Sequence, residues 1–176
     1  MSAAWKTRQD GVRQQEAADF RSRVGENIVP KRAGADGYED ILDGAKPAKG
    51  ERVAVIPYLE ADEALLLRQS AKVVGEADGR VLLQGGVVVV VTDRKIIAAN
   101  TSGGFRPQWE VFTLPYGHLE PGVVAGPRET DVSIPTSGRR CYRVQLADID
   151  SAARLAGSLA GALSRYRRDR MGLEDE

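Results

Sequence analysis

His118 and Cys141 are the two side chains of this 176-residue sequence that could act as a general base and a nucleophile. Such a pair needs a third group to orient the base, and the sequence lacks the motifs that supply one in hydrolases, metalloproteases and nucleotide-binding enzymes. His118 stands close to Tyr116, where it suits packing or a hydrogen bond. Cys141 lies in a strand-like run, in which a thiol behaves as a small apolar group. We therefore predict a protein that is not an enzyme.

Asp148 and Asp150 have the spacing of a paired-carboxylate site, but they stand just before a helical pattern. Side chains there accept hydrogen bonds from the free N–H groups of the first helical turn, so capping explains both. One His and one Cys are too few for a zinc site and exclude an internal disulfide. Gly85 and Gly86 precede a strand rather than a helix, which indicates a β-bulge and not a phosphate-binding loop. We predict no metal and no cofactor.

Three groups of basic residues could hold an anion. The first flanks a turn that contains Glu76 and Asp78, whose charges would repel a phosphate. The second lies in a Thr-Asp-Arg-Lys stretch, where two cations contribute only about 1 kcal/mol each to attachment at an anionic membrane. The third ends the last predicted helix, where the helix dipole also favours cations. The predicted ligand-binding residues are Lys72, Arg80, Arg94 and Lys95, and the predicted partner-binding residues are Arg165, Arg167 and Arg168.

The charges balance over the whole sequence, with 25 Lys and Arg against 25 Asp and Glu. No global field therefore favours a nucleic-acid partner. The N-terminus lacks the apolar core of a secretion signal. The apolar runs are shorter than the ~20 residues that span a bilayer. We expect a cytoplasmic protein, with the inner face of the membrane as an alternative, peripheral location.

The elements that must position these residues are mainly strands. Seven short β-branched runs, from VAVIPYL (53–59) to RRCYRVQLADI (139–149), are separated by turn residues about every 8–12 positions. No helical pattern separates them, which favours an antiparallel sheet, sandwich or small barrel. The period then changes, and Leu155, Leu159 and Leu163 fall on one face of a helix. We predict a mainly β, α+β domain whose curved sheet is closed by this C-terminal helix.

The stretch GGVVVVVTDRKIIAAN (85–100) predicts the central hairpin of that sheet. Five valines exceed what a half-exposed strand needs, so one set should fill a small barrel and the other should lie beneath a covering element, for which the N-terminal helix is the candidate. Asp93 is expected to cap the turn with its side chain, and Thr92–Lys95 to form a solvent-exposed tip. By strand alternation the two sets are Val87, Val89 and Val91 on one face and Val88 and Val90 on the other.

Two motifs in this part of the sequence resemble those of bacterial pleckstrin-homology-like (PH-like) and GRAM-like domains. Residues Val90–Ile97 are similar to a strand of the form LxxTDRRLI, and Leu114–Leu119 is similar to a following IPYxxI segment. With the closing helix, the resemblance covers roughly Glu51–Arg168. It implies a binding module in which cations around the first turn hold a phosphoinositide. Here Leu82 stands where a second Arg would follow Arg80, which weighs against that ligand.

We divide the chain into an extension (1–50), a PH-like domain (51–170) and a flexible tail (171–176). The extension is polar, with a thin apolar stripe that predicts a helix over residues 7–24. Gly- and Pro-rich linkers then flank a small apolar cluster around Tyr38, which could either dock on the domain or bind a partner.

The predicted function is a non-enzymatic PH-like binding module that acts as a protein-interaction adaptor or scaffold. A peptide would lie at a sheet edge or beside the last helix. One alternative is a peripheral membrane module that reads anionic lipid headgroups through the four predicted ligand-binding residues. Another is a structural subunit whose N-terminal arm wraps a neighbour. The acidic turn and the zero net charge favour the adaptor.

Overall fold

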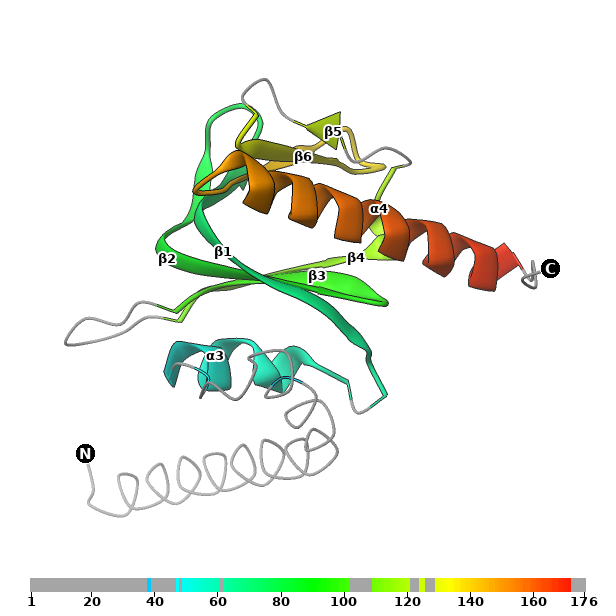
Figure 1. Cartoon of the computed structure of the whole chain (residues 1–176), viewed down its shortest axis with the longest axis horizontal. Coiled ribbons are helices and arrows are strands. Elements are labelled where there is room, and N and C mark those ends of the chain that lie inside the picture. Colours follow the sequence, from blue (N-terminus) through cyan, green and yellow to red (C-terminus); the bar gives the residue numbers. More distant parts are fainter. Residues whose placement is uncertain are drawn as a thin grey trace, which may run out of the picture.

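The computed structural model describes residues 38, 47, 49–60, 62–101, 109–120, 124–125 and 129–171. They form one antiparallel sheet with the strand order β4-β3-β2-β1-β7-β6-β5. Figure 1 shows this sheet with α4 against it. The strands are β1 (Leu65–Glu76), β2 (Val81–Thr92), β3 (Lys95–Asn100), β4 (Val111–Pro115), β5 (Val124–Ala125), β6 (Asp131–Pro135) and β7 (Cys141–Gln145). The helical elements are α3 (Lys49–Ala54), η2 (Ile56–Tyr58), η3 (Tyr116–His118) and α4 (Ile149–Met171).

The predicted fold class is confirmed. β1 joins the two halves of the sheet because it pairs with β2 along its length and with β7 near its end. The sheet curls, and the C-terminal helix α4 lies along its inner side (Figure 1). Seven strands form the sheet, although β5 is only two residues long. The strand order and the closing helix are those of a PH-like fold.

The prediction that VAVIPYL forms the first strand is wrong. Its residues form the end of α3 and the turn η2, and the short strand β5 brings the number back to seven. A strand would bury every second side chain. Here Ala54, Val55 and Leu59 are buried whereas Val53 is exposed, which is a helical spacing. Glu51 is also buried and belongs to the same face of the helix. The apolar pattern of this helix is hard to recognise in the sequence because one of its buried residues is charged.

The inner core lies between the sheet and α4. Leu155, Leu159 and Leu163 are buried there, as their spacing predicts. The helix begins where the Asp148 carboxylate accepts a hydrogen bond from the Ser151 backbone amide at 2.7 Å, and this hydrogen bond lowers the pKa of Asp148. The predicted capping role is thus confirmed for Asp148, while Asp150 is exposed in the first turn.

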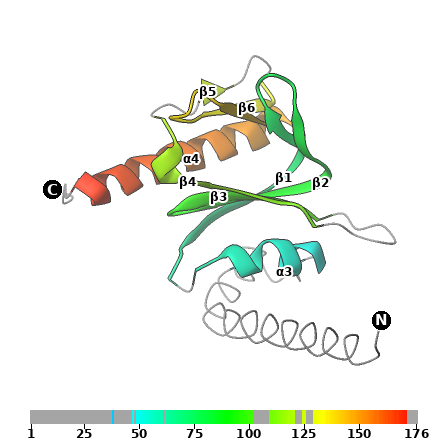
Figure 2. The ribbon, with the colours of Figure 1, turned by 180° about the vertical axis from the view of Figure 1, so that it is seen from behind.

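The opposite face of β2 and β3 is equally apolar and equally buried. We call it the outer face; its members are Val88, Val90, Ile97 and Ala99. Residues 49–60 and Tyr38, which we call the cover, pack against it. Figures 1 and 2 show α3 of the cover and α4 on opposite sides of the sheet. The two predicted sets of valines are confirmed, since Val87, Val89 and Val91 belong to the inner core.

The cover includes residues from the predicted extension. Tyr38 is fully buried, and Gly50 is buried so closely that an added Cβ would lie 2.6 Å from the Thr101 Cα atom. Burial and the nearby Glu51 carboxylate raise the pKa of the Tyr38 phenol well above its usual value, so the phenol stays neutral. The predicted helix over residues 7–24 and the remaining anchors of the extension lie outside the described residues.

The two glycines before the valine run form the predicted β-bulge. Gly85 and Gly86 have φ angles of 75° and 81°, a region that other residues rarely adopt. The register changes at this point, from Ala71 opposite Val87 to Val73 opposite Gln84. β2 therefore carries an extra residue here, which bends the strand and lets the sheet curl.

Packing of α4 on the sheet is tested by Leu159→Ala. The side chain is fully buried, so its truncation should lower the free energy of unfolding by ~2–5 kcal/mol, measured by urea denaturation. Gly157→Ala on the same helix is the control. It meets no atom within 4 Å and should raise stability by about 0.5–1 kcal/mol through helix propensity. If Leu159→Ala changed the free energy of unfolding as little as Gly157→Ala does, α4 would not pack on the sheet through this leucine.

Candidate functional site

The structure places the predicted binding residues at three separate sites. Lys72 and Arg80 belong to the β1–β2 hairpin, Arg94 and Lys95 to the β2–β3 turn, and the three α4 arginines to the C-terminal end of that helix. Lys72 is exposed on β1 and makes no contact with Arg80. The assignment of these residues as binding residues stays a prediction.

The β1–β2 turn lies beside the β6–β7 turn. The Ala77 backbone amide donates a hydrogen bond to the Cys141 carbonyl at 2.8 Å, which continues the pairing of β1 with β7. Asp78 shapes the first turn by accepting a hydrogen bond from the Arg80 amide at 3.0 Å, and Gly79 follows with a φ of 100°. Arg139 has a φ of 62° in the second turn, a left-handed conformation that is uncommon outside glycine.

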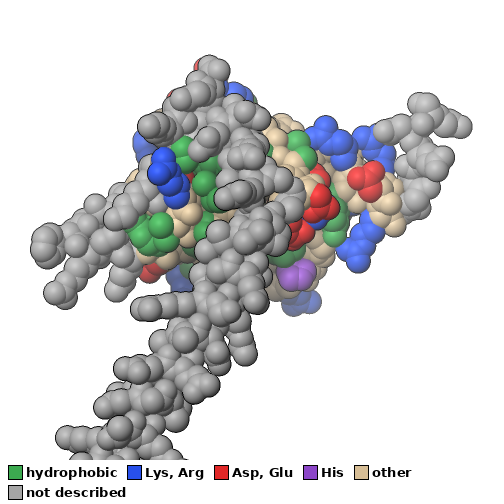
Figure 3. Space-filling model, turned by 90° about the horizontal axis from the view of Figure 1, so that it is seen from below, with side chains coloured by type: hydrophobic (Ala, Val, Ile, Leu, Met, Phe, Trp, Pro, Cys, Tyr) green, Lys and Arg blue, Asp and Glu red, His purple; other side chains and the backbone are tan. Residues whose placement is uncertain are grey.

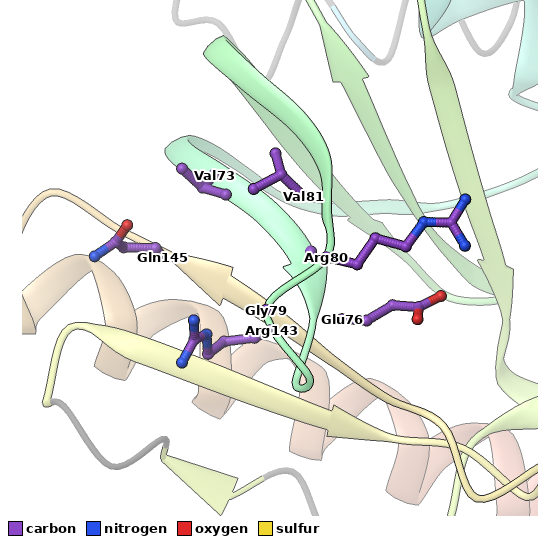
Figure 4. A pocket seen from close by; sticks show the side chains of 8 residues that line it. Val73, Glu76, Gly79, Arg80, Val81, Arg143 and Gln145 are labelled. Carbon is purple, nitrogen blue, oxygen red and sulfur yellow. The ribbon is translucent and has the colours of Figure 1, made fainter.

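Two neighbouring hollows mark this end of the sheet, and Glu76 lines both. The larger has a volume of about 210 Å³ and is lined by Glu76, Ala77, Asp78, Arg139, Arg140 and Cys141. The smaller, of about 30 Å³, is lined by residues that include Arg80 and Arg143. In Figure 4, Glu76 and Arg80 extend in the same direction from the β1–β2 hairpin, and Arg143 and Gln145 project from β7. We call these two hollows with their arginines the turn site.

The charges of the turn site are not balanced locally. Arg80, Arg139 and Arg140 are exposed, and within the described residues their side chains form no hydrogen bond or ion pair. The Arg143 Nε atom lies 3.7 Å from the buried Asp131 carboxylate. Glu76 and Asp78 add two negative charges among these arginines. The site can therefore accept an anionic group, although its own carboxylates limit how much negative charge it tolerates.

Arg94 and Lys95 are engaged by carboxylates at the end of the cover and in the segment that follows it. Arg94 pairs with Glu60 and Asp62, each at 2.6 Å, and Lys95 pairs with Glu63 at 2.9 Å. The hydrogen bonds from Arg94 lower the pKa values of Glu60 and Asp62 below their usual range. This cluster fastens the cover's C-terminal end to the β2–β3 turn.

Two predictions for this turn are wrong. The turn is capped by Thr92, whose hydroxyl oxygen accepts hydrogen bonds from the backbone amides of Arg94 and Lys95 at 3.1 and 3.0 Å. The Asp93 carboxylate instead accepts a hydrogen bond from the Ala64 amide at 3.1 Å. The stretch is also not a solvent-exposed tip, because Thr92 is fully buried and the Lys95 side chain is only 13% exposed. The incoming acidic segment covers both.

The basic end of α4 is partly used within the fold. Arg167 donates a hydrogen bond to the Leu119 carbonyl at 3.4 Å, and Arg170 donates one to the Tyr166 hydroxyl at 2.8 Å. Arg165 is exposed, and Arg168 makes a contact of its own. Figure 3 shows Lys and Arg side chains gathered at this projecting end of the molecule. Neither hollow of the turn site includes a residue of this basic surface.

The residues weighed for catalysis do not come together. His118 is exposed in η3, and the half-buried Cys141 thiol donates a hydrogen bond to the adjacent Tyr142 carbonyl at 3.6 Å. Over the described part of the chain, no three His, Cys, Asp or Glu side chains are grouped as metal ligands would be. Nor does any helix in that part have the length and apolar character needed to cross a bilayer.

No protein-family model and no curated protein matches this sequence. A solved structure of Vav1 with an allosteric inhibitor is similar in fold, with 7% identity, a TM-score of 0.48, and coverage of 85% of this chain and 38% of that chain. An N-terminally truncated linker-DH/PH structure of p115-RhoGEF has 8% identity, a TM-score of 0.46, and coverage of 85% and 43%. The chain thus spans less than half of either, and this similarity carries no functional inference.

The role of Thr92 in holding the acidic segment is tested by Thr92→Val. The change keeps the shape of the side chain but leaves two turn amides and the buried Glu63 without its hydroxyl, so it should cost ~1–3 kcal/mol in unfolding free energy. Arg94→Ala removes only exposed ion pairs and should cost about 1 kcal/mol or less. Urea denaturation measures the loss of unfolding free energy in both variants. A larger loss for Arg94→Ala than for Thr92→Val would contradict this account of the turn.

Proposed function

We propose that the protein is a non-enzymatic, PH-like binding module that acts as an adaptor, and that it holds an acidic segment of a partner protein at the turn site. The observation that carries this proposal is that Arg139 and Arg140 line the larger hollow and Arg80 lines the smaller one beside it, and that the side chains of all three have no partner in the described structure. Guanidinium groups are well suited to this role because they bind carboxylates through two parallel hydrogen bonds.

The size of the larger hollow supports a protein partner. Pockets for small molecules typically measure ~300–1,000 Å³. The hollow at the turn site, at about 210 Å³, is smaller and matches one or two side chains. An acidic side chain inserted there would meet Arg139 and Arg140, and a neighbouring side chain of the peptide could reach Arg80 in the smaller hollow. Small, desolvated contacts of this kind carry much of the binding energy at protein interfaces.

The charge pattern favours a protein segment over a polyphosphorylated lipid headgroup. Glu76 and Asp78 lie among the arginines and would repel a group of high negative charge. Arg94 and Lys95, which a lipid site was predicted to use, are engaged by Glu60, Asp62 and Glu63. A peptide with one or two carboxylates can pair with the arginines and brings less negative charge close to Glu76 and Asp78, which line the same hollow. We propose a cytoplasmic setting for this interaction, as the composition suggests.

The proposal is tested with the full chain on an array of immobilised acidic peptides. Arg139→Glu with Arg140→Glu should reduce binding at least tenfold, which corresponds to ~1.4 kcal/mol, because it reverses two charges of the larger hollow. Lys72→Glu is the matched control, since it reverses one exposed charge that lines neither hollow, and it should bind like the parent protein.

Vesicles of phosphatidylcholine with a phosphoinositide form the second arm. Weak recruitment that fades with added salt agrees with the adaptor proposal. Strong, salt-resistant recruitment that is lost in Arg80→Glu would show that the turn site reads a lipid headgroup instead. Equal peptide binding by the double variant and the control would also overturn the proposal.

A further inference from the structure

The outer face of β2 and β3 is an apolar surface that the fold does not need for closing its barrel. The inner core with α4 already closes the sheet, yet the side chains of Val90, Ile97 and Ala99 on the other face are completely buried. Burial there depends on the cover, a segment that reaches the sheet from outside it. Without the cover this face would be an exposed apolar surface, and large surfaces of that kind mark interaction sites in proteins.

The cover and the sheet are complementary in charge. The carboxylates lie on the cover and on the residues just after it, and their basic partners lie on the sheet. The buried Glu51 of α3 forms an ion pair with the partly exposed Arg68 of β1, whose Nε atom is 2.8 Å from the carboxylate. Glu60 and Asp62 pair with Arg94 of the β2–β3 turn. The outer face with its rim of cations is therefore shaped for an acidic, amphipathic segment.

The cover has little structure of its own to hold it in place. α3 has six residues and η2 has three, which is too short for a stable isolated helix. Just after the cover, the buried Glu63 pairs with Lys95. The end of the cover itself is held by exposed ion pairs, in which the Arg94 and Glu60 side chains are 36% and 57% exposed. Pairs of this kind are weak and are screened by salt. The cover thus depends on docking, as a bound peptide does.

We propose that the outer face is a second docking surface, that its ligand is a short, acidic amphipathic helix of a partner protein, and that the cover is its intramolecular occupant. The partner segment would repeat the chemistry of the cover: apolar side chains at the spacing of Ala54, Val55 and Leu59, with a carboxylate before them for Arg68 and others after them for Arg94. Because the cover is tethered, its high effective concentration keeps partners out until it is loosened.

Gly50 provides a way to loosen the cover without altering the outer face. An added Cβ at this position would lie 2.6 Å from the Thr101 Cα atom and 2.8 Å from the Thr101 carbonyl oxygen. Both are backbone atoms, so the helix must move away from the sheet. Gly50→Ala should therefore undock α3 and leave the apolar side chains and cations of the outer face unchanged.

The test uses the full chain and a fluorescent peptide with the sequence of residues 49–63. The peptide should bind Gly50→Ala at least tenfold more tightly than the parent protein, as measured by fluorescence anisotropy. Gly157→Ala makes the same substitution in open space and should bind like the parent protein. A peptide with lysine in place of Glu51, Glu60 and Asp62 should not bind. In the parent protein, amides of residues 51–59 should exchange with deuterium faster than those of Val88–Val91.

Three results would overturn the proposal. The first is that the backbone amides of the cover and of β2 exchange with deuterium at the same rate, which would mean that the cover unfolds only together with the core. The second is equal peptide binding by Gly50→Ala and Gly157→Ala. The third is that light scattering gives Gly50→Ala the mass of a dimer, which would mean that a second copy of the chain occupies the outer face. If Gly50→Ala does not fold, Glu60→Ala with Asp62→Ala loosens the cover's other end, and the same outcomes apply.

Discussion

The burial of β2 on both faces is the constraint on which the rest of this structure depends. A strand at the surface of a small barrel normally has one apolar side and one polar side. β2 has two apolar sides, with Val89 in the inner core and Val90 on the outer face, and both are completely buried. The sheet must therefore be covered twice. The helix α4 covers the inner side, and the cover, which arrives from the predicted extension, covers the outer side.

Covering the outer face also determines where charged groups are available. The segment that leads from the cover into β1 crosses the β2–β3 turn, and its carboxylates neutralise Arg94 and Lys95. Among the described residues, basic side chains also stay available at the opposite hairpin, where Arg139 and Arg140 line a hollow beside the β1–β2 turn. The cations of the β2–β3 turn are thus engaged by the protein's own carboxylates, whereas those of the turn site are open. This contrast is the basis for assigning the turn site to a partner.

Patterns that depend on one element could be predicted from the sequence. The alternation of Val89 and Val90, the leucine face of α4 and the bulge at Gly85 each follow from local spacing. The cover could not be predicted in this way. Its helical face includes Glu51, a charged residue that is buried only because Arg68 lies against it, 17 positions away in the sequence. The engagement of Arg94 by Glu60 spans 34 positions, and the turn site joins the β1–β2 turn to the β6–β7 turn, which lie far apart in the sequence.

The two-sided burial of β2 is tested most directly by measuring the unfolding free energies of Val89→Ala and Val90→Ala. The two valines are adjacent, equally buried, and face the inner core and the cover respectively. Each truncation should cost roughly 1.5–3 kcal/mol, because both side chains lose a packed, water-free environment. The account predicts similar losses for the two variants. A large loss for Val89→Ala with almost none for Val90→Ala would contradict it, since the outer face would then be open to water.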